Sequence, residues 1–264
     1  MINMEELLPK VEQWSREVGD IQLKNLGNKE LDIDIKGSYT DIVTEVDKLS
    51  EKHLIKVISD TYPYHGILSE ESGHNTKESD YLWIIDPLDG TTNYSKGIPI
   101  FAISIALKYK EETVLGLIYN PYQDEMFTAV KEGGAFLNGN KIRVTDKEDL
   151  RESLLATGFP YDKNVNPDNN FHYFAHFLTI ARGIRRMGAA AWDLSYVAAG
   201  RFDGFWELNL APWDVAAGAL LVEEAGGKVA YLDKRGVSLA AANHLLCDKM
   251  LEEMKTADIQ GHHD

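Results

Sequence analysis

Residues 83–94 read Trp-Ile-Ile-Asp-Pro-Leu-Asp-Gly-Thr-Thr-Asn-Tyr, an apolar strand that ends in two carboxylates, a glycine and two hydroxyls. The carboxylates, Asp86 and Asp89, supply hard oxygen ligands of the kind that Mg²⁺ prefers. They are followed by Gly90, Thr91 and Thr92. These three residues can open a helix whose unpaired N–H groups point at an anion. The stretch therefore predicts a site that holds a divalent metal ion and a phosphate group together.

Plainer interpretations of the same stretch have to be weighed. Asp-Gly is a common turn pair, and an aspartate at the end of a strand is often only a helix cap. An EF-hand loop needs oxygen side chains at alternate positions and a glutamate at the twelfth. Leu88 and Gly90 occupy alternate positions here, which excludes that class of calcium site.

Two further acidic segments favour a metal site over these interpretations. Residues 68–73 read Leu-Ser-Glu-Glu-Ser-Gly and lie a short loop upstream of the strand. Residues 211–218 read Ala-Pro-Trp-Asp-Val-Ala-Ala-Gly, the start of a helix with Asp214 in its first turn. A carboxylate that bridges two metal ions can hold them at the spacing that phosphate chemistry needs. Asp86, at the end of the strand, is the best candidate for that bridge.

At this point the chain resembles a known family, the inositol monophosphatases, which are Mg²⁺-dependent, lithium-sensitive sugar-phosphate phosphatases. The resemblance is carried by Glu-Glu-Ser at 70–72, Asp-Pro-Leu-Asp-Gly-Thr-Thr-Asn at 86–93, Trp-Asp at 213–214 and Glu-Ala-Gly-Gly at 224–227. Segments around Asp47 and over residues 185–194 also look like family segments in the family order. The resemblance spans roughly residues 36–227 and implies hydrolysis of a phosphate monoester by metal-activated water.

Carried over by position, the resemblance implies two or three Mg²⁺ ions in the site. Glu70, Asp86 and the backbone carbonyl of Leu88 would hold the first ion. Asp86, Asp89 and Asp214 would hold the second. A third, weaker ion would bind Glu70 through water.

The resemblance also implies how water and phosphate are held. Glu70 and Thr91 would orient the attacking water, and Asp47 would accept a hydrogen bond from the Thr91 hydroxyl. The phosphate oxygens would contact the N–H groups of Gly90, Thr91 and Thr92. No covalent phosphoenzyme is expected.

Contacts to the hydroxyls of a polyol are implied for Asp89, Gly188, Ala189, Ala190 and Glu207. Glu207 lies seven residues before Asp214, the spacing found in the family; its plainer interpretation is a surface glutamate at a strand end. Ala189 stands where many members have Thr or Ser. The missing hydroxyl weakens the expectation of strict selectivity for inositol.

Several other charged residues have assigned roles. Arg185 and Arg186 could contact a carboxylate or second phosphate of a ligand, or form a surface or interface; we assign Arg185 to the substrate. Lys36 resembles a residue of the family's loop near the third metal. Asp193, in an alanine-rich stretch, is expected to pair with an arginine.

Composition agrees with a small-molecule enzyme. The net charge of −15 argues against a general nucleic-acid binder or membrane-surface protein, which would show a basic patch. An acidic enzyme must recruit an anionic phosphate through bound cations. The single cysteine, Cys247, excludes an intrachain disulfide and is expected in the core. Without a signal peptide or a run of roughly 18 apolar residues, a cytoplasmic location is expected. We also expect a homodimer.

Apolar periodicity predicts the secondary structure. Steps of three and four predict helices over residues 4–25 and 47–60, and alternation predicts a meander of strands over 100–136. We expect further strands at 153–157, 203–208 and 228–231, and further helices at 171–181, 189–199 and 215–225.

These elements predict two halves. Residues 1–150 form an α+β half with the metal motifs and residues 151–264 an α/β half, together one compact catalytic unit. The polar run 162–170 is the best boundary loop. The resemblance implies a layered α-β-α-β-α sandwich with the site between the halves, and residues 228–264 have no assigned role.

Three functions follow. The first is a Mg²⁺-dependent phosphomonoesterase acting on myo-inositol monophosphate or a similar polyol phosphate. The second is the same chemistry on NADP(H), fructose 1,6-bisphosphate or 3′-phosphoadenosine 5′-phosphate, because resembling families use these substrates. The third is a non-catalytic, regulatory role as a partner of the transcription machinery, known among relatives.

Overall fold

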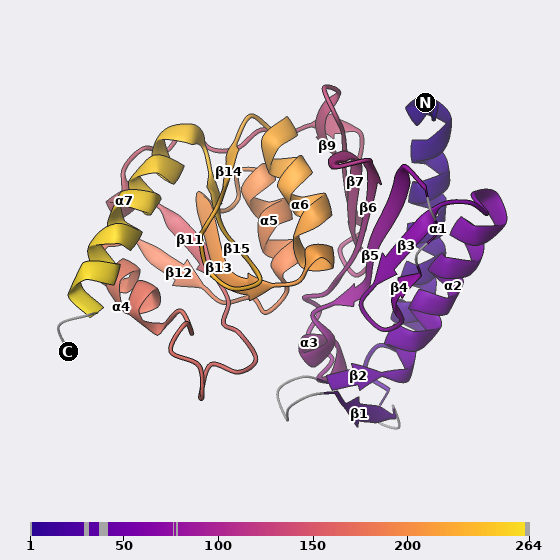
Figure 1. Ribbon diagram of the computed structural model, residues 1–264, viewed down its shortest axis with the longest axis horizontal. Helices are drawn as coiled ribbons and strands as arrows, with labels where there is room; N and C mark the ends of the chain where they lie inside the picture. The colour runs from indigo at the N-terminus through magenta and orange to yellow at the C-terminus, as the bar shows by residue number, and fades with distance from the viewer. Residues whose placement is uncertain (1, 29–31, 37–41, 76, 78, 262–264) are drawn as a thin grey trace.

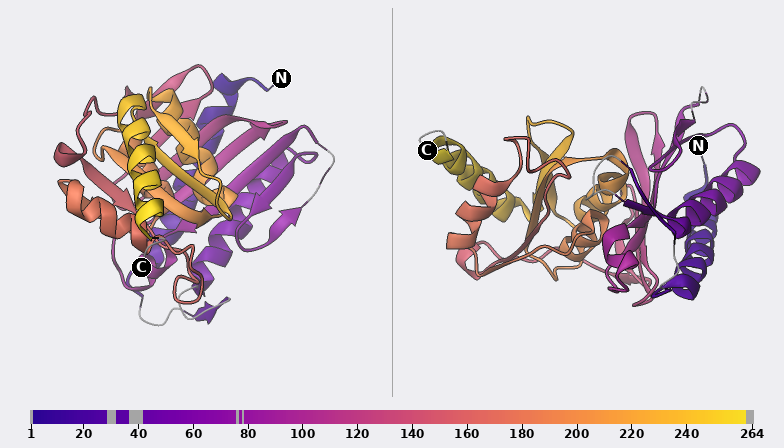
Figure 2. Two further views of the ribbon diagram at one scale, coloured as in Figure 1. Left: turned by 60° about the vertical axis from the view of Figure 1, so that its left-hand side comes forward. Right: turned by 90° about the horizontal axis from the view of Figure 1, so that it is seen from below.

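The computed structural model describes all residues except 1, 29–31, 37–41, 76, 78 and 262–264. It consists of five layers, three of helices and two of sheet (Figure 1). The outer helices on one side are α1 (Met4–Asn25) and α2 (Glu45–Thr61), the helices between the sheets are α5 (Ala190–Ala198) and α6 (Pro212–Glu224), and those on the other side are α4 (Phe171–Ile180) and α7 (His244–Gly261). The expected α-β-α-β-α sandwich is confirmed. Figure 2 shows α7 and α1 at opposite ends of this stack.

The larger sheet belongs to the first half of the chain. In spatial order its strands are β10 (Asn140–Lys141), β9 (Gly134–Leu137), β8 (Glu125–Val130), β7 (Glu112–Asn120), β6 (Ala102–Tyr109), β5 (Tyr81–Asp89), β3 (Gly66–Ser69) and β4 (Gly73–Asn75). Strands β3 and β5 are parallel, and the other neighbours are antiparallel. The predicted meander is confirmed as β6 to β9. A short helix, α3 (Thr91–Ser95), follows β5 and contacts the separate hairpin of β1 (Ile33–Ile35) and β2 (Ile42–Thr44).

The smaller sheet belongs to the second half. Its strands, in spatial order, are β12 (Gly183–Arg185), β11 (Leu154–Thr157), β13 (Gly204–Leu210), β15 (Val237–Ala242) and β14 (Lys228–Tyr231). The expected strands and helices of this half are found, with ends that differ by at most three residues. The polar composition of residues 162–170 predicted a boundary between the halves. Instead, this run lies within the second half, where it connects β11 to α4. The chain passes between the sheets after β10 and before β11.

The tail beyond residue 231 has no helix or strand predicted from its sequence. The tail contributes β15 and α7, and both are built into the core. Cys247 is buried with Leu246 and Met250 against β15, which confirms the expected core position of the thiol. The start of α7 had a sequence signal: the Asn243 side chain accepts a hydrogen bond from the Leu246 N–H at 2.9 Å, as helix caps do.

Helices cover both faces of the larger sheet, and this determines which residue types occur in its strands. In β6, Ile103 and Ile105 pack against the outer helices, whereas Ala102 and Ala106 face the helices between the sheets. Alternation in such a strand is between large and small apolar residues, because neither face meets water. The small residues leave room for α6 to lie close to the sheet.

Helix α6 approaches the larger sheet closely at Gly116 in β7. A Cβ atom at this position would lie 2.8 Å from the carbonyl oxygen of Ala217 and 3.1 Å from its Cα. Both contacts are with backbone, which cannot rotate away. Gly116 therefore fixes the distance between α6, which carries Asp214, and the sheet that carries Asp86 and Asp89.

The described part of the chain contains no helix with the length and apolar character needed to cross a membrane.

Replacing Gly116 by alanine should push α6 away from the sheet. We expect Gly116→Ala to lower the free energy of unfolding by about 1–3 kcal/mol, the usual cost of overpacking. Gly183→Ala is the matched control, because a Cβ there meets only side-chain atoms at 3.6 Å. Urea unfolding of both variants measures the effect. Equal stability of the two would show that α6 does not depend on this contact.

Candidate active site

Asp86 and Asp89 lie on the same side of the larger sheet because β5 contains a bulge. Residues three apart in a regular strand point to opposite faces. Asp86 pairs with Ser104 and Asp89 with Ala102, so three steps on β5 match two on β6. The extra residue restores both carboxylates to one face, as bulges do next to active sites. The sequence predicted that Asp86 and Asp89 act in one site, but it did not predict the bulge that makes this possible.

The N-terminal helix supports the bulge. Gln22 of α1 is buried, and its side-chain amide donates to the carbonyl oxygen of Pro87 at 2.7 Å. The Tyr94 hydroxyl donates to the backbone carbonyl of Gln22 at 2.7 Å. Pro87 lacks a backbone N–H and so cannot donate a hydrogen bond to a neighbouring strand. Proline is therefore tolerated at a bulge. The first helix thus fixes the position of the strand that carries Asp86 and Asp89.

Two helices of the second half bring further groups to this point. Asp214 is in the first turn of α6, where its Oδ2 accepts the Ala211 N–H at 2.7 Å in a capping arrangement. Asp89 Oδ2 accepts the N–H groups of Ala191 at 2.8 Å and Trp192 at 3.3 Å at the start of α5. Both carboxylates therefore lie at helix N-termini, where negative charge is stabilised.

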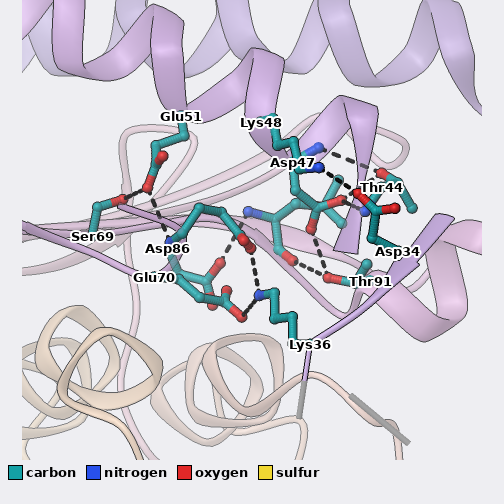
Figure 3. A network of polar contacts seen from close by, with 12 residues as sticks. Asp34, Lys36, Thr44, Asp47, Lys48, Glu51, Ser69, Glu70, Asp86 and Thr91 are labelled. Atoms are coloured by element: carbon teal, nitrogen blue, oxygen red, sulfur yellow. Dashed lines mark hydrogen bonds and ion pairs between the residues drawn. The ribbon is translucent and has the colours of Figure 1, made fainter. Parts of the chain in front are cut away.

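Glu70 is held by an acidic residue that sequence reasoning missed. Glu51 of α2 is buried, and its carboxylate accepts the N–H groups of Glu71 and Ser72 at 3.0 Å each, as well as the hydroxyls of Ser69 and Ser72. It therefore fixes the loop that carries Glu70 (Figure 3). The signal available was spacing: Glu51 follows Asp47 by four residues, on the same helix face.

Lys36 contacts the acidic loop from the β1–β2 hairpin. Its ammonium group lies 2.7 Å from Glu70 Oε1 and 2.5 Å from Glu71 Oε1 (Figure 3). Burial alone would lower the pKa of Lys36, but the two glutamates raise it above its usual value. Burial raises the pKa of Glu71 to about 7 even though Lys36 lowers it. Lys36 therefore lies beside Glu70, one of the predicted ligands.

Thr91 and Asp47 form the expected hydrogen bond. The Thr91 hydroxyl lies 2.8 Å from Asp47 Oδ1 and 3.1 Å from the Leu88 carbonyl oxygen (Figure 3). Asp47 Oδ2 accepts the N–H of Thr44 at 2.9 Å, closing the capping box of α2. The same box starts α2 two residues before the predicted position. Gly90, before Thr91, has a φ of 94°, and a Cβ there would meet the Ile100 carbonyl oxygen at 2.8 Å.

The carboxylates raise one another's pKa values. Burial raises the pKa of Asp86, and Glu70, Asp89 and Asp214 raise it further. Burial raises the pKa of Asp89 to about 7, although the amides of Trp192 and Ala191 lower it. Burial and then Asp89 raise the pKa of Asp214. These mutual effects show that the predicted ligands converge on one region.

The donor set fits a hard divalent cation. Within the described residues, no ion pair reaches Asp86, Asp89 or Asp214, although the first two are buried. Unpaired buried charge is costly, and carboxylate oxygens are what Mg²⁺ binds. In the described part of the chain, no three acidic, His or Cys side chains already stand as ligands around one point. The amides of Ala191 and Trp192 bind Oδ2 of Asp89, and the Ala211 amide binds Oδ2 of Asp214, so each carboxylate could use its other oxygen for an ion.

A small cavity of about 100 Å³ lies beside the carboxylates and contains the expected substrate contacts. Its wall includes Asp89, Gly188, Ala189, Ala190 and Glu207. Glu207 closely approaches Gly158, where any side chain would overlap its carboxylate. Burial raises the pKa of Glu207 to about 8, with Arg186 lowering it and Asp89 raising it. Glu207 thus lies in the site and not on the outer surface.

Two predictions about this cavity require correction. Both arginines are exposed, but Arg186 lines the cavity, whereas Arg185 does not line it and donates to the carbonyl of Ile184 at 3.2 Å. Neighbouring residues in extended backbone point to opposite sides, so only one of the two can face the site. Asp193 is buried, but its Oδ1 has no hydrogen-bond partner, and no ion pair joins it to an arginine of the described residues. Burial and Glu207 raise the pKa of Asp193, and Arg186 lowers it only in part.

Known proteins resemble this chain over most of its length. A model of the inositol monophosphatase family matches residues 3–263. The Nus factor SuhB of Pseudomonas aeruginosa is 49% identical over 194 residues, 72% of this chain and 72% of that protein. The inositol-1-monophosphatase of Synechocystis sp. is 40% identical over 238 residues, 89% of this chain and 83% of that protein.

Solved structures agree as well. The structure of inositol monophosphatase from Anabaena (Nostoc) sp. superimposes with a TM-score of 0.85 at 38% identity, covering 97% of each chain. The chain belongs to the inositol monophosphatase family, as its motifs predict.

The raised pKa values predict how pH affects the stability of the metal-free protein. The pKa of Asp89 rises from 3.8 to about 7 and that of Glu207 from 4.5 to about 8 on folding. At pH values between the unfolded and folded pKa of each group, the folded state binds more protons than the unfolded state. The free energy of unfolding therefore falls as pH rises through this range. In chelator, the urea midpoint should therefore decrease from pH 5 to pH 8, and Mg²⁺ should restore it at pH 8. A midpoint in chelator that increases over this range would contradict the assignment.

Proposed function

We propose that this chain is a Mg²⁺-dependent phosphatase that hydrolyses monoesters of polyols, with myo-inositol monophosphate as the representative substrate. The observation that supports it most is the meeting of carboxylates from both halves beside the Gly-Thr-Thr turn. Glu70, Asp86 and Asp89 come from the first half and Asp214 from the second. The two halves would then act as one catalytic unit. Lithium sensitivity and two or three ions per site are part of the same proposal.

The reaction is a single displacement at phosphorus. The water oxygen forms a bond to phosphorus while the bond to the alcohol oxygen breaks, and a proton from water ends on the released alcohol. Magnesium, when bound, neutralises the phosphoryl oxygens, lowers the pKa of the water and stabilises the leaving oxygen. Glu70, Asp86, Asp89, Asp214 and the Leu88 carbonyl would hold it.

The protein's own groups orient the water and the phosphate. Because the Thr91 hydroxyl donates to Asp47, its oxygen lone pairs stay available to accept a hydrogen bond from the water. The Glu70 carboxylate would accept a hydrogen bond from the other O–H of the water. The first-turn N–H groups of α3 lack partners within the helix and can donate to phosphate oxygens. Gly90 allows the sharp turn that presents them.

The alcohol part of the substrate would occupy the cavity beside Glu207. Asp89 and Glu207 are acceptors for hydroxyl groups, and the backbone of residues 188–190 forms the opposite wall. Ala189 is at the N-cap position of α5 and makes no side-chain capping bond. The absence of a hydroxyl there supports acceptance of several polyols rather than strict selection of inositol.

A second candidate function is regulatory. The Pseudomonas relative is named a Nus factor, so a role beside the transcription machinery is plausible for this chain too. No segment of the sequence identifies a surface for such a partner. Asp86→Asn distinguishes the two functions in cells: a regulatory role independent of catalysis would survive the substitution, and a catalytic role would not.

Metal binding and catalysis should separate in two variants. Thr91→Ala should reduce kcat by roughly 10²-fold or more, the scale of general-base positioning, with Mg²⁺ affinity nearly unchanged. Asp86→Asn should weaken Mg²⁺ binding and turnover together, because it removes a shared ligand charge. Ser95→Ala, at the other end of α3, controls for loss of a hydroxyl. Calorimetry with Mg²⁺ and a phosphate-release assay measure both quantities. Loss of Mg²⁺ binding in Thr91→Ala, or full wild-type activity in chelator, would refute this division of roles.

Glu207 should affect polyol substrates selectively. A buried acceptor that loses its partner costs about 1–3 kcal/mol, so Glu207→Ala should lower kcat/KM for inositol monophosphate about tenfold or more. A small aryl phosphate lacks the hydroxyl and should be hydrolysed almost as before. Glu207→Gln keeps an acceptor oxygen and should lose less. Equal losses on both substrates would mean that Glu207 only supports the fold of the site.

A further inference from the structure

The cavity beside Glu207 is bordered by the loop of residues 158–170, which connects β11 to α4. Phe159, Pro160 and Tyr161, near the start of this loop, line the cavity. The proposed function assigns this space to the alcohol part of the substrate. The contacts that hold the loop therefore determine the shape of the space in which the alcohol would bind.

Asn170 joins the two ends of this loop. Its side chain is fully buried, and its amide group donates to the Gly158 carbonyl oxygen at 2.6 Å and to the Thr157 hydroxyl at 2.9 Å. Its Oδ1 accepts the indole N–H of Trp206 at 2.7 Å. The backbone of Asn170 has a φ of 73°, which asparagine adopts more readily than most residues. A compact loop whose ends are joined in this way is an Ω-loop, a type that is frequently functional.

The same hydrogen bonds hold the surroundings of the Glu207 carboxylate. Trp206 precedes Glu207 on β13, and the Thr157 hydroxyl donates to the Trp206 carbonyl oxygen at 2.6 Å. Gly158 packs against the Glu207 carboxylate so closely that any side chain there would overlap it. Asn170 therefore ties the strand residue before Glu207 to the glycine that contacts its carboxylate. Asn170 does not line the cavity itself, so it would act on a substrate through these neighbours.

The outer part of the Ω-loop is held by the tail of the chain. Arg235, in the turn between β14 and β15, donates to the two carboxylate oxygens of Asp162 at 2.8 and 2.6 Å. It also donates to the Asp168 carbonyl oxygen at 3.3 Å. A bidentate pair between arginine and a carboxylate fixes direction as well as distance. The tail turn thus holds the residue that follows Tyr161 of the cavity wall.

We propose that the Ω-loop is a selectivity element of this site, and that Asn170 and Arg235 are its positioning residues. They hold the loop and the Glu207 carboxylate where a polyol binds. The inference rests on the proposed function, in which Glu207 accepts a hydrogen bond from a hydroxyl of the alcohol. Such a bond needs the two oxygens within about 2.5–3.0 Å and well aligned, so a small displacement of Glu207 weakens it.

Cleavage at phosphorus should depend little on these two residues. The side-chain hydrogen bonds of Asn170 and Arg235 go to the Ω-loop, to β11 and to β13. None of these partners is a predicted metal ligand or part of the turn assigned to phosphate. A substrate without hydroxyls should therefore be hydrolysed at a nearly unchanged rate when either side chain is removed.

The first test removes the Asn170 side chain and keeps its backbone conformation. Asn170→Gly retains a residue that adopts positive φ readily. It should lower kcat/KM for inositol monophosphate about tenfold or more, mainly through KM, with a small aryl phosphate nearly unaffected. Asn138→Gly is the matched control. Asn138 has a φ of 48°, and its side chain bonds the backbone of Met126 at 2.8 Å and of Asp124 at 2.9 Å, away from the cavity.

A double-mutant cycle shows whether Asn170 acts through Glu207. In a Glu207→Ala background, Asn170→Gly should change kcat/KM for inositol monophosphate by less than about twofold, because the acceptor that it positions is already absent. A general loss of structure would lower kcat/KM again, for polyol and aryl phosphates alike. Losses that multiply in the double variant, or equal losses on the two substrates, would overturn the inference.

Arg235→Met keeps the inference testable if Asn170→Gly does not fold. The side chains of Arg235 and Asp162 are 29% and 41% exposed, so the substitution leaves the core intact. Loss of this partly exposed pair should lower kcat/KM for inositol monophosphate about threefold and leave the aryl phosphate unchanged. Arg151→Met is the matched control, because Arg151 pairs with Asp149 at 2.6 Å without lining the cavity. Equal ratios of polyol to aryl kcat/KM in these two variants would contradict a selectivity role for the loop.

Hydrogen–deuterium exchange separates failure of this inference from failure of the proposed function. Peptides covering residues 158–163 and 204–208 should exchange faster in Asn170→Gly than in the wild type, and no faster in Asn138→Gly. If the wild type releases phosphate from no monoester, the proposed function fails, while unchanged exchange in Asn170→Gly would still show that Asn170 does not hold the loop. If the wild type hydrolyses inositol monophosphate but both loop variants keep its polyol-to-aryl ratio of kcat/KM, only this inference fails.

Discussion

Negative charge placed at the junction of the two halves is the constraint on which the rest of this structure depends. Asp86 and Asp89 are buried, and Asp214 and Glu70 lie close enough to raise the pKa of Asp86. Buried charges that are not paired cost several kcal/mol each. Backbone amides offset part of the cost at Asp89 and Asp214. The remaining charge needs a cation, and this need explains why an acidic protein can act on an anionic substrate.

The layers of the fold serve to bring these charges together from distant parts of the chain. The larger sheet carries two of them on one bulged strand, and α6 carries a third from the second half. The separation is fixed where α6 meets the backbone of β7 at Gly116. Residues that never contact substrate therefore determine the metal site: Gln22 holds the bulge, and Glu51 holds the loop of Glu70. Small changes in packing should appear as changes in metal binding.

Sequence reasoning was strongest where a side chain carries its own chemistry. Residue type and spacing along one strand predicted the carboxylates of the ligand motif, whereas the family resemblance implied the Thr91–Asp47 hydrogen bond and the place of Glu207. The sequence could not reveal which of two adjacent arginines faces the cavity, since that depends on how the backbone leaves β12. It also could not reveal the role of Glu51, because a buried glutamate accepting four hydrogen bonds resembles any helix-surface glutamate in sequence.

The tail was missed for a different physical reason. Strand β15 reads Val-Ser-Leu-Ala-Ala-Ala, and alanine is a poor strand former. Its place in the sheet comes from tertiary packing, where β13, β14 and α7 surround residues too small to expose any apolar pattern. Local strand propensity therefore fails to predict strands of small residues that are held in place by packing against neighbouring elements. The same reasoning applies to the small residues of β6 that face α6.

In the proposed function, Asp89 links the metal site to substrate selection. Asp89 follows the bulge, its carboxylate accepts the first amides of α5, and it lines the cavity beside Glu207. Helix α5 begins beside Ala189, which lines the same cavity. One residue would then bind metal, hold a helix and line the substrate space, so that metal binding and substrate preference would be coupled. Selectivity should therefore evolve at positions that line this cavity without binding metal, such as Ala189 and Arg186.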